Sequence, residues 1–202
     1  MVYTVIRRHV VEQANVDEIV RRTIEGGIPI IQKAPGFLSY RLVKADDGTL
    51  ITISIFETPA QGDESRHMAA AWFKENLSSL LPNPPQVIGG EVRVRLVMGG
   101  APYKFGVMRR YPRVTDIAEV ARRIEAGGLV GGLPTTSNLT GFATNVLVDP
   151  GDGSAVSLSA FRDRATAEQS IQVAHDWGQQ HLAPFLLDPP EVTICEIVGG
   201  AP

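Results

Sequence analysis

An internal duplication constrains this chain more than any other feature of its sequence. Segments of the first half recur in the same order in the second half, in register from Gly36 onward. The recurring pairs are YTVIRRH (3–9) and YKFGVMRRY (103–111), EIVRRTIEGG (18–27) and EVARRIEAGG (119–128), PGFLSYRLV (35–43) and TGFATNVLV (140–148), AWFKENLSSLLPNPPQV (71–87) and DWGQQHLAPFLLDPPEV (176–192), and GGAP (99–102 and 199–202). A repeat of this length is one structural unit used twice. We therefore predict a first domain at 1–98, a linker at 99–102 and a second domain at 103–202.

Each copy predicts the element order β-α-β-β-α-β. The expected elements of the first copy are a strand at 3–10, a helix at 16–33 with Asn15 or Asp17 as its N-cap, strands at 37–44 and 50–57 joined by the turn Asp46-Asp47-Gly48, a helix at 61–80, and a strand at 91–98. Prolines end both helices. This order is the ferredoxin-like plan, in which both helices cover one face of an antiparallel sheet.

A single unit of this kind leaves the other face of its sheet bare. We therefore predict that the two sheets face each other in an internal pseudo-dimer with a barrel-like space between them. The third strand of each copy alternates aliphatic residues with a second set, which is Thr52, Ser54 and Phe56 in one copy and Ser157, Ser159 and Phe161 in the other. Small hydroxyl residues at these positions predict an enclosed, partly polar cavity between the sheets.

Composition excludes several classes of partner. The 202 residues are 44% apolar with a net charge of −3, and the basic residues form no stripe, so no nucleic acid is expected. No apolar run approaches the roughly 20 residues of a membrane helix, and the first residues carry charges, so we expect a cytoplasmic protein with no membrane partner. The single cysteine, Cys195, is expected to pack in the last strand, and no spacing predicts a metal site.

The repeated unit resembles a known family. PGF before the second strand, an aromatic residue ending the third strand, a Trp in the second helix, and PPQV or PPEV leading into the last strand are similar to the antibiotic biosynthesis monooxygenase (ABM-type) family. The resemblance implies an α+β fold of two tandem ferredoxin-like domains, an intramolecular version of the family's dimeric α+β barrel. It implies a ligand between sheet and helices or within the barrel. A further homodimer of the chain is left open.

The resemblance implies chemistry of several kinds. Family members include oxygenases that act on polycyclic aromatic ketones without a cofactor, quinol oxygenases and haem-degrading enzymes. The haem-degrading members carry an Asn on the first strand, where this chain has Arg7-Arg8 and Arg109-Arg110. We therefore expect a monooxygenase or related oxidoreductase without a cofactor, acting on a small aromatic, quinone-like or polyketide-like molecule. The alternative is a non-catalytic module that binds a hydrophobic metabolite or serves in assembly.

The second helix carries the most informative difference between the copies. Asn76 and His181 lie at matching positions on the apolar stripe, one turn after Trp72 and Trp177. A buried polar group needs a hydrogen-bond partner. Each residue is therefore either a satisfied helix-end residue or a polar group at the edge of a pocket.

The second copy is the better candidate for activity, because Gly178 replaces Phe73 and Asn145 replaces Tyr40. The glycine-rich segment 127–134 is either a lid or a plain connection. An oxygenase of this type needs a base and a group that holds the substrate anion. We assign His181 as the base and Asn145 or Arg109 as the anion holder, with Trp177 and Phe161 as walls. The remaining predicted binding residues are Ser159 in the second copy and Arg7, Tyr40, Phe56, Trp72 and Asn76 in the first. One Arg of each pair must point inward, and strand periodicity alone leaves open which one.

Overall fold

The computed structural model describes residues 1–98, 102–129 and 136–202. Its strands are β1 (Tyr3–His9), β2 (Phe37–Ala45), β3 (Leu50–Phe56), β4 (Gln86–Val97), β5 (Phe105–Tyr111), β6 (Phe142–Asp149), β7 (Ala155–Phe161) and β8 (Glu191–Ala201). Its α-helices are α1 (Val16–Arg22), α2 (Ile28–Ile31), α3 (Pro59–Asn76), α4 (Ile117–Leu129) and α5 (Arg164–His181). The predicted linker and most of the glycine-rich segment fall outside the described residues.

The contacts divide the chain into two compact units. Unit 1 comprises Met1–Glu91 with Glu196–Pro202, and unit 2 comprises Val92–Cys195. The long strands β4 and β8 run through both units. The strands follow the hydrogen-bonded order β1-β3-β2-β8-β5-β7-β6-β4, which closes on itself as a barrel. The predicted α+β fold of tandem β-α-β-β-α-β units is confirmed.

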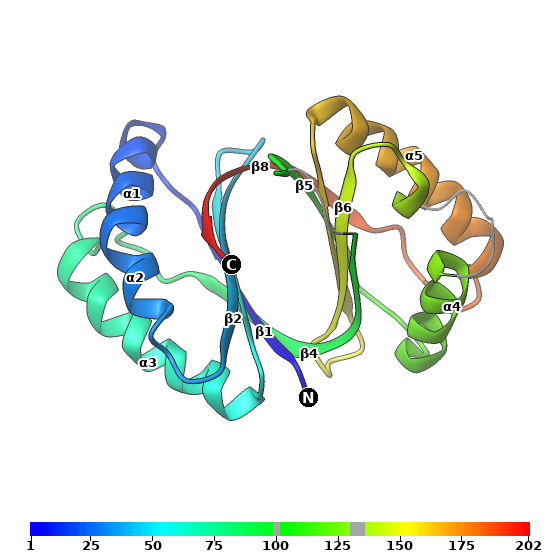
Figure 1. Cartoon of the computed structure of the whole chain (residues 1–202), viewed down its shortest axis with the longest axis horizontal. Helices are drawn as coiled ribbons and strands as arrows, with labels where there is room; N and C mark the ends of the chain where they lie inside the picture. Colours follow the sequence, from blue (N-terminus) through cyan, green and yellow to red (C-terminus); the bar gives the residue numbers. More distant parts are fainter. Residues whose placement is uncertain (99–101, 130–135) are drawn as a thin grey trace. The chain divides into compact units, whose positions relative to one another are not determined.

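The sheet of unit 1 is antiparallel throughout its described pairs. Strand β1 pairs with β3 on one side and β4 on the other, and β2 pairs with β3. The register places Arg7 opposite Thr52, and Tyr40 opposite Ser54. Helices α1, α2 and α3 all lie on one face of this sheet (Figure 1). The other face of this sheet is not covered by these three helices (Figure 1).

The first helical stretch of unit 1 is interrupted, where the sequence predicted one helix. A π-turn at Thr23–Gly27 separates α1 from α2. Pro29 follows it and has no N–H to donate to the carbonyl four residues earlier, so the ordinary α-helical pattern fails there. The ring of Trp72 packs against the bare backbone of Gly26 and Gly27, where an added Cβ would lie 3.0 Å from ring atoms.

The helix ends also correct the sequence-based boundaries. Thr58 caps α3 by accepting a hydrogen bond from the Gln61 N–H, so the helix begins at Pro59. It ends at Asn76, one turn before the predicted end. Asn15 precedes α1, but its side chain makes no capping hydrogen bond.

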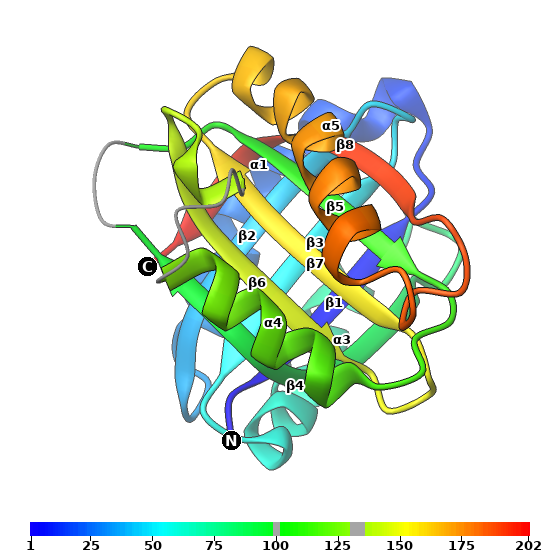
Figure 2. The same ribbon diagram turned by 90° about the vertical axis from the view of Figure 1, so that its right-hand side faces the viewer.

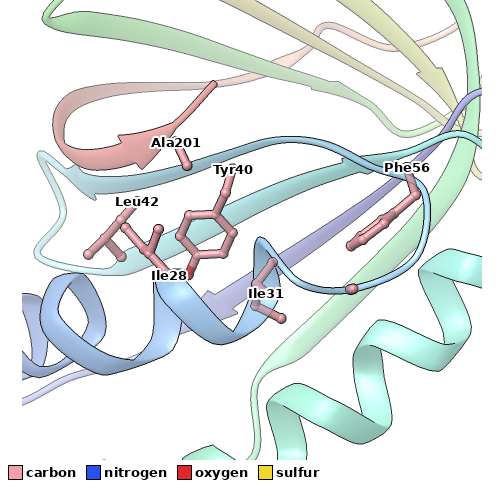
Figure 3. Close-up of a cluster of buried hydrophobic side chains, with 7 residues drawn as sticks. Ile28, Ile31, Tyr40, Leu42, Phe56 and Ala201 are labelled. Carbon is pink, nitrogen blue, oxygen red and sulfur yellow. The ribbon is translucent and has the colours of Figure 1, made fainter.

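A hydrophobic core lies between sheet and helices in each unit. In unit 1, Tyr40 and Leu42 of β2 pack with Ile28 and Ile31 of α2 (Figure 3). In unit 2, α4 and α5 cross the face of the sheet that holds β5, β6 and β7 (Figure 2). The core there includes Val94, Val120, Leu147, Ala155 and Leu182. Within the described residues, no helix is both long enough and apolar enough to span a membrane.

Candidate functional site

A pocket lies between the sheet and the helices of unit 2. It measures about 790 Å³ with its opening to solvent included. Apolar side chains make most of its lining, and a small polar group occupies the strand side. The lining residues are Leu96, Arg109, Tyr111, Val120, Ile124, Ser137, Phe142, Asn145, Leu147, Ala155, Ser157, Ser159, Ala174, Trp177, Gly178, Leu182 and Leu186.

Arg109 is the charged group of this pocket. Arg109 as a whole is only 3% exposed to solvent. The guanidinium donates hydrogen bonds to Ser159 Oγ at 3.3 Å and to Ser170, at 3.0 Å to the carbonyl oxygen and 2.9 Å to Oγ. All of these partners are neutral, and no described carboxylate pairs with Arg109. Burial lowers the pKa of Arg109, but an arginine retains its charge in proteins. The pocket therefore holds a buried cation without a counter-ion.

Asn145 extends the polar group along the sheet. Its Nδ2 donates to Ser157 Oγ at 3.1 Å and to Ser159 Oγ at 2.8 Å. Both amide hydrogens are thus used within the strands, which leaves the amide oxygen as the remaining polar atom of this side chain. Arg109 and Asn145 meet at one shared partner, the hydroxyl of Ser159. The two side chains are held in fixed positions by this network.

Two aromatic side chains complete the wall. Trp177 lines the pocket, and its buried Nε1–H has no hydrogen-bond partner among the residues that the structure describes. Tyr111 lies two residues after Arg109 on the same strand face, and burial raises the pKa of its phenol, partly opposed by the charge of Arg109. Tyr111 is therefore a neutral donor. Trp177, Tyr111 and Arg109, each of which carries a hydrogen-bond donor, all line this pocket.

Gly178 opens one side of the pocket. A Cβ built at this position would meet no atom within 4 Å in the described part of the chain, its two chain neighbours aside. The matching residue of unit 1 is Phe73, which carries a phenyl ring that lines the unit 1 pocket. The sequence-based inference that Gly178 makes room for a ligand agrees with this geometry.

Unit 1 has an equivalent pocket of about 600 Å³, measured in the same way. Phe73 lines it and stacks on His9, with ring centroids 5.1 Å apart. Burial and the charge of Arg7 lower the pKa of His9 to about 4. The other lining residues are Arg7, Ile19, Thr23, Gly27, Ile30, Ile31, Tyr40, Leu42, Leu50, Thr52, Ala69, Trp72, Leu77 and Leu81.

The question of which arginine points inward is answered the same way in both units. Arg7 and Arg109 line the pockets. Arg8 forms an ion pair with Asp47, and Arg110 forms one with Glu191 at 3.5 Å. The first arginine of each pair is therefore the candidate for ligand contact.

The hydroxyl residues correct one prediction. We expected Thr52, Ser157 and Ser159 to line a space between the two sheets, but they line pockets between the sheet and the helices of single units. Alternation along a strand fixes one face, yet it cannot say which face the helices cover.

Phe56 and Phe161 lie in the cores beside these pockets. Phe161 packs edge-to-face on Phe142, and Phe56 does so on Phe37. Neither is among the lining residues, whereas Trp177 and Trp72, which the sequence also assigned to binding, do line the two pockets.

Asn76 and His181 occupy matching helix ends but differ in their side-chain contacts. Asn76 Nδ2 donates to the Trp72 carbonyl at 2.8 Å, which satisfies the amide within its own helix. The His181 ring lies 5.1 Å from that of Trp177, and its buried Nε2 has no partner. Neither residue lines a pocket. His181 contacts the pocket only through Trp177.

Sequence reasoning did not assign two residues of the site. Tyr111 could have been found from its spacing, because it lies two positions after Arg109 on one strand face. Ser170 is fully buried on α5 and binds Arg109, and only the three-dimensional packing of α5 on β5 reveals this contact. Among the described residues, no cluster of His, Cys, Asp and Glu could hold a metal ion.

No family model matches the sequence, and no curated protein matches it significantly. Solved structures do match. A protein proposed to be a monooxygenase from Fusobacterium nucleatum superposes with a TM-score of 0.71 at 10% identity, covering 98% of this chain and 93% of that one. An anthrone oxidase-like protein gives 0.66 at 13% identity, covering 99% and 92%. A ferredoxin-fold protein related to antibiotic biosynthesis monooxygenases, from Listeria monocytogenes, gives 0.52 at 8% identity, covering 98% and 94%.

The chain has the fold of the antibiotic biosynthesis monooxygenases. The match extends over nearly the whole length of the chain, as expected for a tandem ABM-type fold. Identities this low show a shared fold alone. The reaction and substrate must therefore be argued from the pocket of this chain itself.

Proposed function

We propose that this chain is an ABM-type monooxygenase that works without a cofactor and oxidises a small aromatic, quinone-like or polyketide-like substrate in the pocket of unit 2. One observation carries the proposal. Arg109 is a buried cation with only neutral partners, at the polar side of a pocket whose lining is mostly apolar. A planar molecule that becomes anionic during the reaction complements this arrangement.

The chemistry needs an electron-rich anion, because triplet oxygen reacts slowly with closed-shell molecules. In an aromatic ketone with an acidic CH₂ group, loss of a proton forms an enolate whose oxygen accepts hydrogen bonds from Arg109. The enolate passes electrons to O₂, and the CH₂ carbon becomes a carbonyl. One oxygen atom enters the product and the other leaves as water, so no external reductant is required.

The protein's contribution is electrostatic and positional. Arg109 stabilises the anion and so lowers the pKa of the bound substrate. Asn145 and Ser159 hold the guanidinium side of the pocket in place, and Trp177 offers a ring face to the substrate. His181 remains our proposed base. It packs against the pocket wall through Trp177, and its Nε2 is free of partners in the described structure.

One observation favours the alternative, a module that binds an aromatic metabolite without turnover. The residues that line the unit 2 pocket include no carboxylate and no imidazole. A pocket of this composition can hold an anion, but it cannot by itself take a proton from a weakly acidic substrate.

Oxygen uptake with a panel of anthrones and hydroquinones distinguishes these functions. We expect turnover that falls by about 100-fold or more in Arg109→Gln, the usual effect of losing one anion-stabilising donor. Arg110→Gln is the matched control, because Arg110 lies beside Arg109 and pairs with Glu191 outside the pocket. Mass spectrometry after reaction under ¹⁸O₂ should find one labelled oxygen in the product. Saturable binding without turnover on any substrate would establish the binding module, and equal rates in the two variants would overturn the role of Arg109.

A further inference from the structure

The pocket of unit 1 has hydrogen-bonding capacity that nothing in the protein uses. Arg7 and His9 both line it. Arg7 Nη2 and His9 Nδ1 are buried, and neither atom has a hydrogen-bond partner in the described structure. His9 as a whole is only 6% exposed. A buried polar atom without a hydrogen-bond partner destabilises the folded protein, and a bound ligand that supplies the partner would remove that cost.

The matching atoms of unit 2 are arranged differently. Arg109 Nη2 donates to the carbonyl and hydroxyl oxygens of Ser170. The serine hydroxyls themselves behave alike, because Ser170 donates to the Ala167 carbonyl at 2.6 Å and its unit 1 equivalent, Ser65, donates to the Gly62 carbonyl at 2.7 Å. The difference between the units lies in the arginine. Arg7 Nη2 is left without the protein partner that its counterpart has. The two pockets therefore differ in the hydrogen bonding of their arginines.

The electrostatics of the unit 1 pocket favour an anion. Arg7 is close enough to Arg66 for repulsion between the two charges to help lower the pKa of Arg7, after burial as the main cause. The Tyr40 phenol is neutral, because burial raises its pKa to about 12. The lining contains no carboxylate. The pocket therefore carries an uncompensated positive charge.

The positions of the two unsatisfied atoms limit the ligand. Arg7 and His9 lie two residues apart on one face of β1, so their Cα atoms are roughly 7 Å apart. Trp72, Phe73, Leu42 and Leu50 supply aromatic and aliphatic walls. A flat ring with an acidic group at one position and a second polar group at another would reach both atoms.

We propose that the pocket of unit 1 is a second ligand site, which binds an aromatic monoanion of the hydroxybenzoate class. Arg7 Nη2 donates a hydrogen bond to the carboxylate, and His9 Nδ1 bonds the ring hydroxyl. Trp72 forms the wall beside them. This site is distinct from the oxidation proposed for unit 2 and does not depend on it.

The two tryptophans make the sites separately observable. The sequence has only Trp72 and Trp177, and one lines each pocket. In Trp177→Phe, all tryptophan fluorescence comes from the unit 1 pocket. We expect 3- and 4-hydroxybenzoate to quench it saturably, and the uncharged hydroxybenzyl alcohols to bind at least 10-fold more weakly. Free N-acetyltryptophanamide corrects for absorption by the ligand.

Variants in the Trp177→Phe background test the assigned contacts. Arg7→Gln should weaken hydroxybenzoate binding by 10-fold or more, whereas Arg8→Gln should not, because Arg8 pairs with Asp47 instead. His9→Phe keeps an aromatic ring on Phe73 and should weaken binding of the hydroxybenzoates while leaving benzoate binding nearly unchanged. If Arg7→Gln does not fold, Arg7→Lys replaces it and should retain partial affinity.

Absence of saturable Trp72 quenching, or equal affinities in the Arg7 and Arg8 variants, would overturn this site. Because the readout is binding at Trp72 and not oxygen uptake, such a failure leaves the proposed oxidation in unit 2 untouched, and the reverse also holds.

Discussion

The ring of Phe73 stacks on the imidazole of His9, with their planes 18° apart. In unit 2, Gly178 stands in place of Phe73 and Tyr111 in place of His9, so this ring stacking is absent there. Both residues line the unit 2 pocket, and the space beyond Gly178 is open. The unit 2 pocket lacks this phenyl ring, and it measures about 790 Å³ against about 600 Å³ in unit 1, each with its opening to solvent included.

Replacing Gly178 with Phe should close the pocket of unit 2. A phenyl group at this position would stack on Tyr111 as Phe73 stacks on His9, and it would occupy the space needed by a ring-sized ligand. We expect ligand affinity at Trp177 to fall by at least 10-fold, measured by quenching in a Trp72→Phe background. Gly178→Ala is the control and should retain most of the affinity. Unchanged binding in Gly178→Phe would place the ligand elsewhere.

Replacing Arg109 with Met should remove function without a loss of stability. The guanidinium is buried without a counter-ion, so the fold bears a desolvation cost that an apolar side chain of similar length avoids. The lost hydrogen bonds to Ser159 and Ser170 offset part of the gain. We expect the free energy of unfolding, from urea denaturation, to stay within about 1 kcal/mol of the parent protein or to rise. A fall of several kcal/mol would show that Arg109 is chiefly structural.

Replacing His181 with Ala tests the proposed base. General-base catalysis contributes roughly 100-fold or more to rates, so oxygen uptake should fall by that factor. The Arg123 contact to this helix end is kept, because Arg123 binds the His181 carbonyl at 2.7 Å and not the ring. Asn76→Ala is the matched control in unit 1, where Arg22 binds the Asn76 carbonyl at 2.8 Å. Equal rates in the parent and His181→Ala would remove His181 from the mechanism.

The repeat in the sequence predicts the element order of this fold because each copy carries the same alternation of β and helical periodicity. It also singles out Gly178 and Asn145, since a duplicated chain shows where one copy departs from the other. These inferences need only local pattern and comparison of the halves. The element order predicted in this way is confirmed by the structure.

The parts that were missed depend on packing between elements. Strand periodicity shows that Ser157 and Ser159 share a face, but only the position of α5 reveals that this face meets the helices. The partner of Arg109 is Ser170, distant along the chain on another element. The helical stripe places His181 beside Trp177, and the His181 ring contacts this lining residue without itself lining the pocket. Contacts between elements cannot be predicted from the pattern of residues along a single element.

The stability of the protein should depend on pH through His9. Its pKa falls from 6.5 to about 4 in the folded state, so between these values the unfolded chain binds a proton that the folded chain does not. The contribution of His9 is therefore complete above pH 6.5 and is lost as pH falls toward 4. The maximal loss is about 3 kcal/mol.

Urea denaturation at pH 7 and pH 4.5 measures this dependence. His9→Tyr, which places the unit 2 residue in unit 1, should remove most of it. Glu18 and Glu119 are carboxylates with pKa values of about 2, held low by hydrogen bonds from neighbouring arginines, and they protonate outside this range. If stability changes equally between pH 7 and pH 4.5 in the parent protein and in His9→Tyr, His9 is not the source of the pH dependence.

Two helical glycines of unit 2 should respond oppositely to substitution by alanine. Gly178 lies in α5 with open space around its missing Cβ, so Gly178→Ala gains helix propensity at no steric cost and should raise stability by about 1 kcal/mol. Gly127 lies in α4, where a Cβ would stand 2.9 Å from Trp177 Cζ2. Overpacking of this kind costs roughly 1–3 kcal/mol, which outweighs the same propensity gain. Thermal denaturation of the two single variants should therefore shift the midpoint up for Gly178→Ala and down for Gly127→Ala. Because both substitutions add one methyl group to a helical glycine, equal shifts would mean that the close contact between Gly127 and Trp177 does not constrain α4.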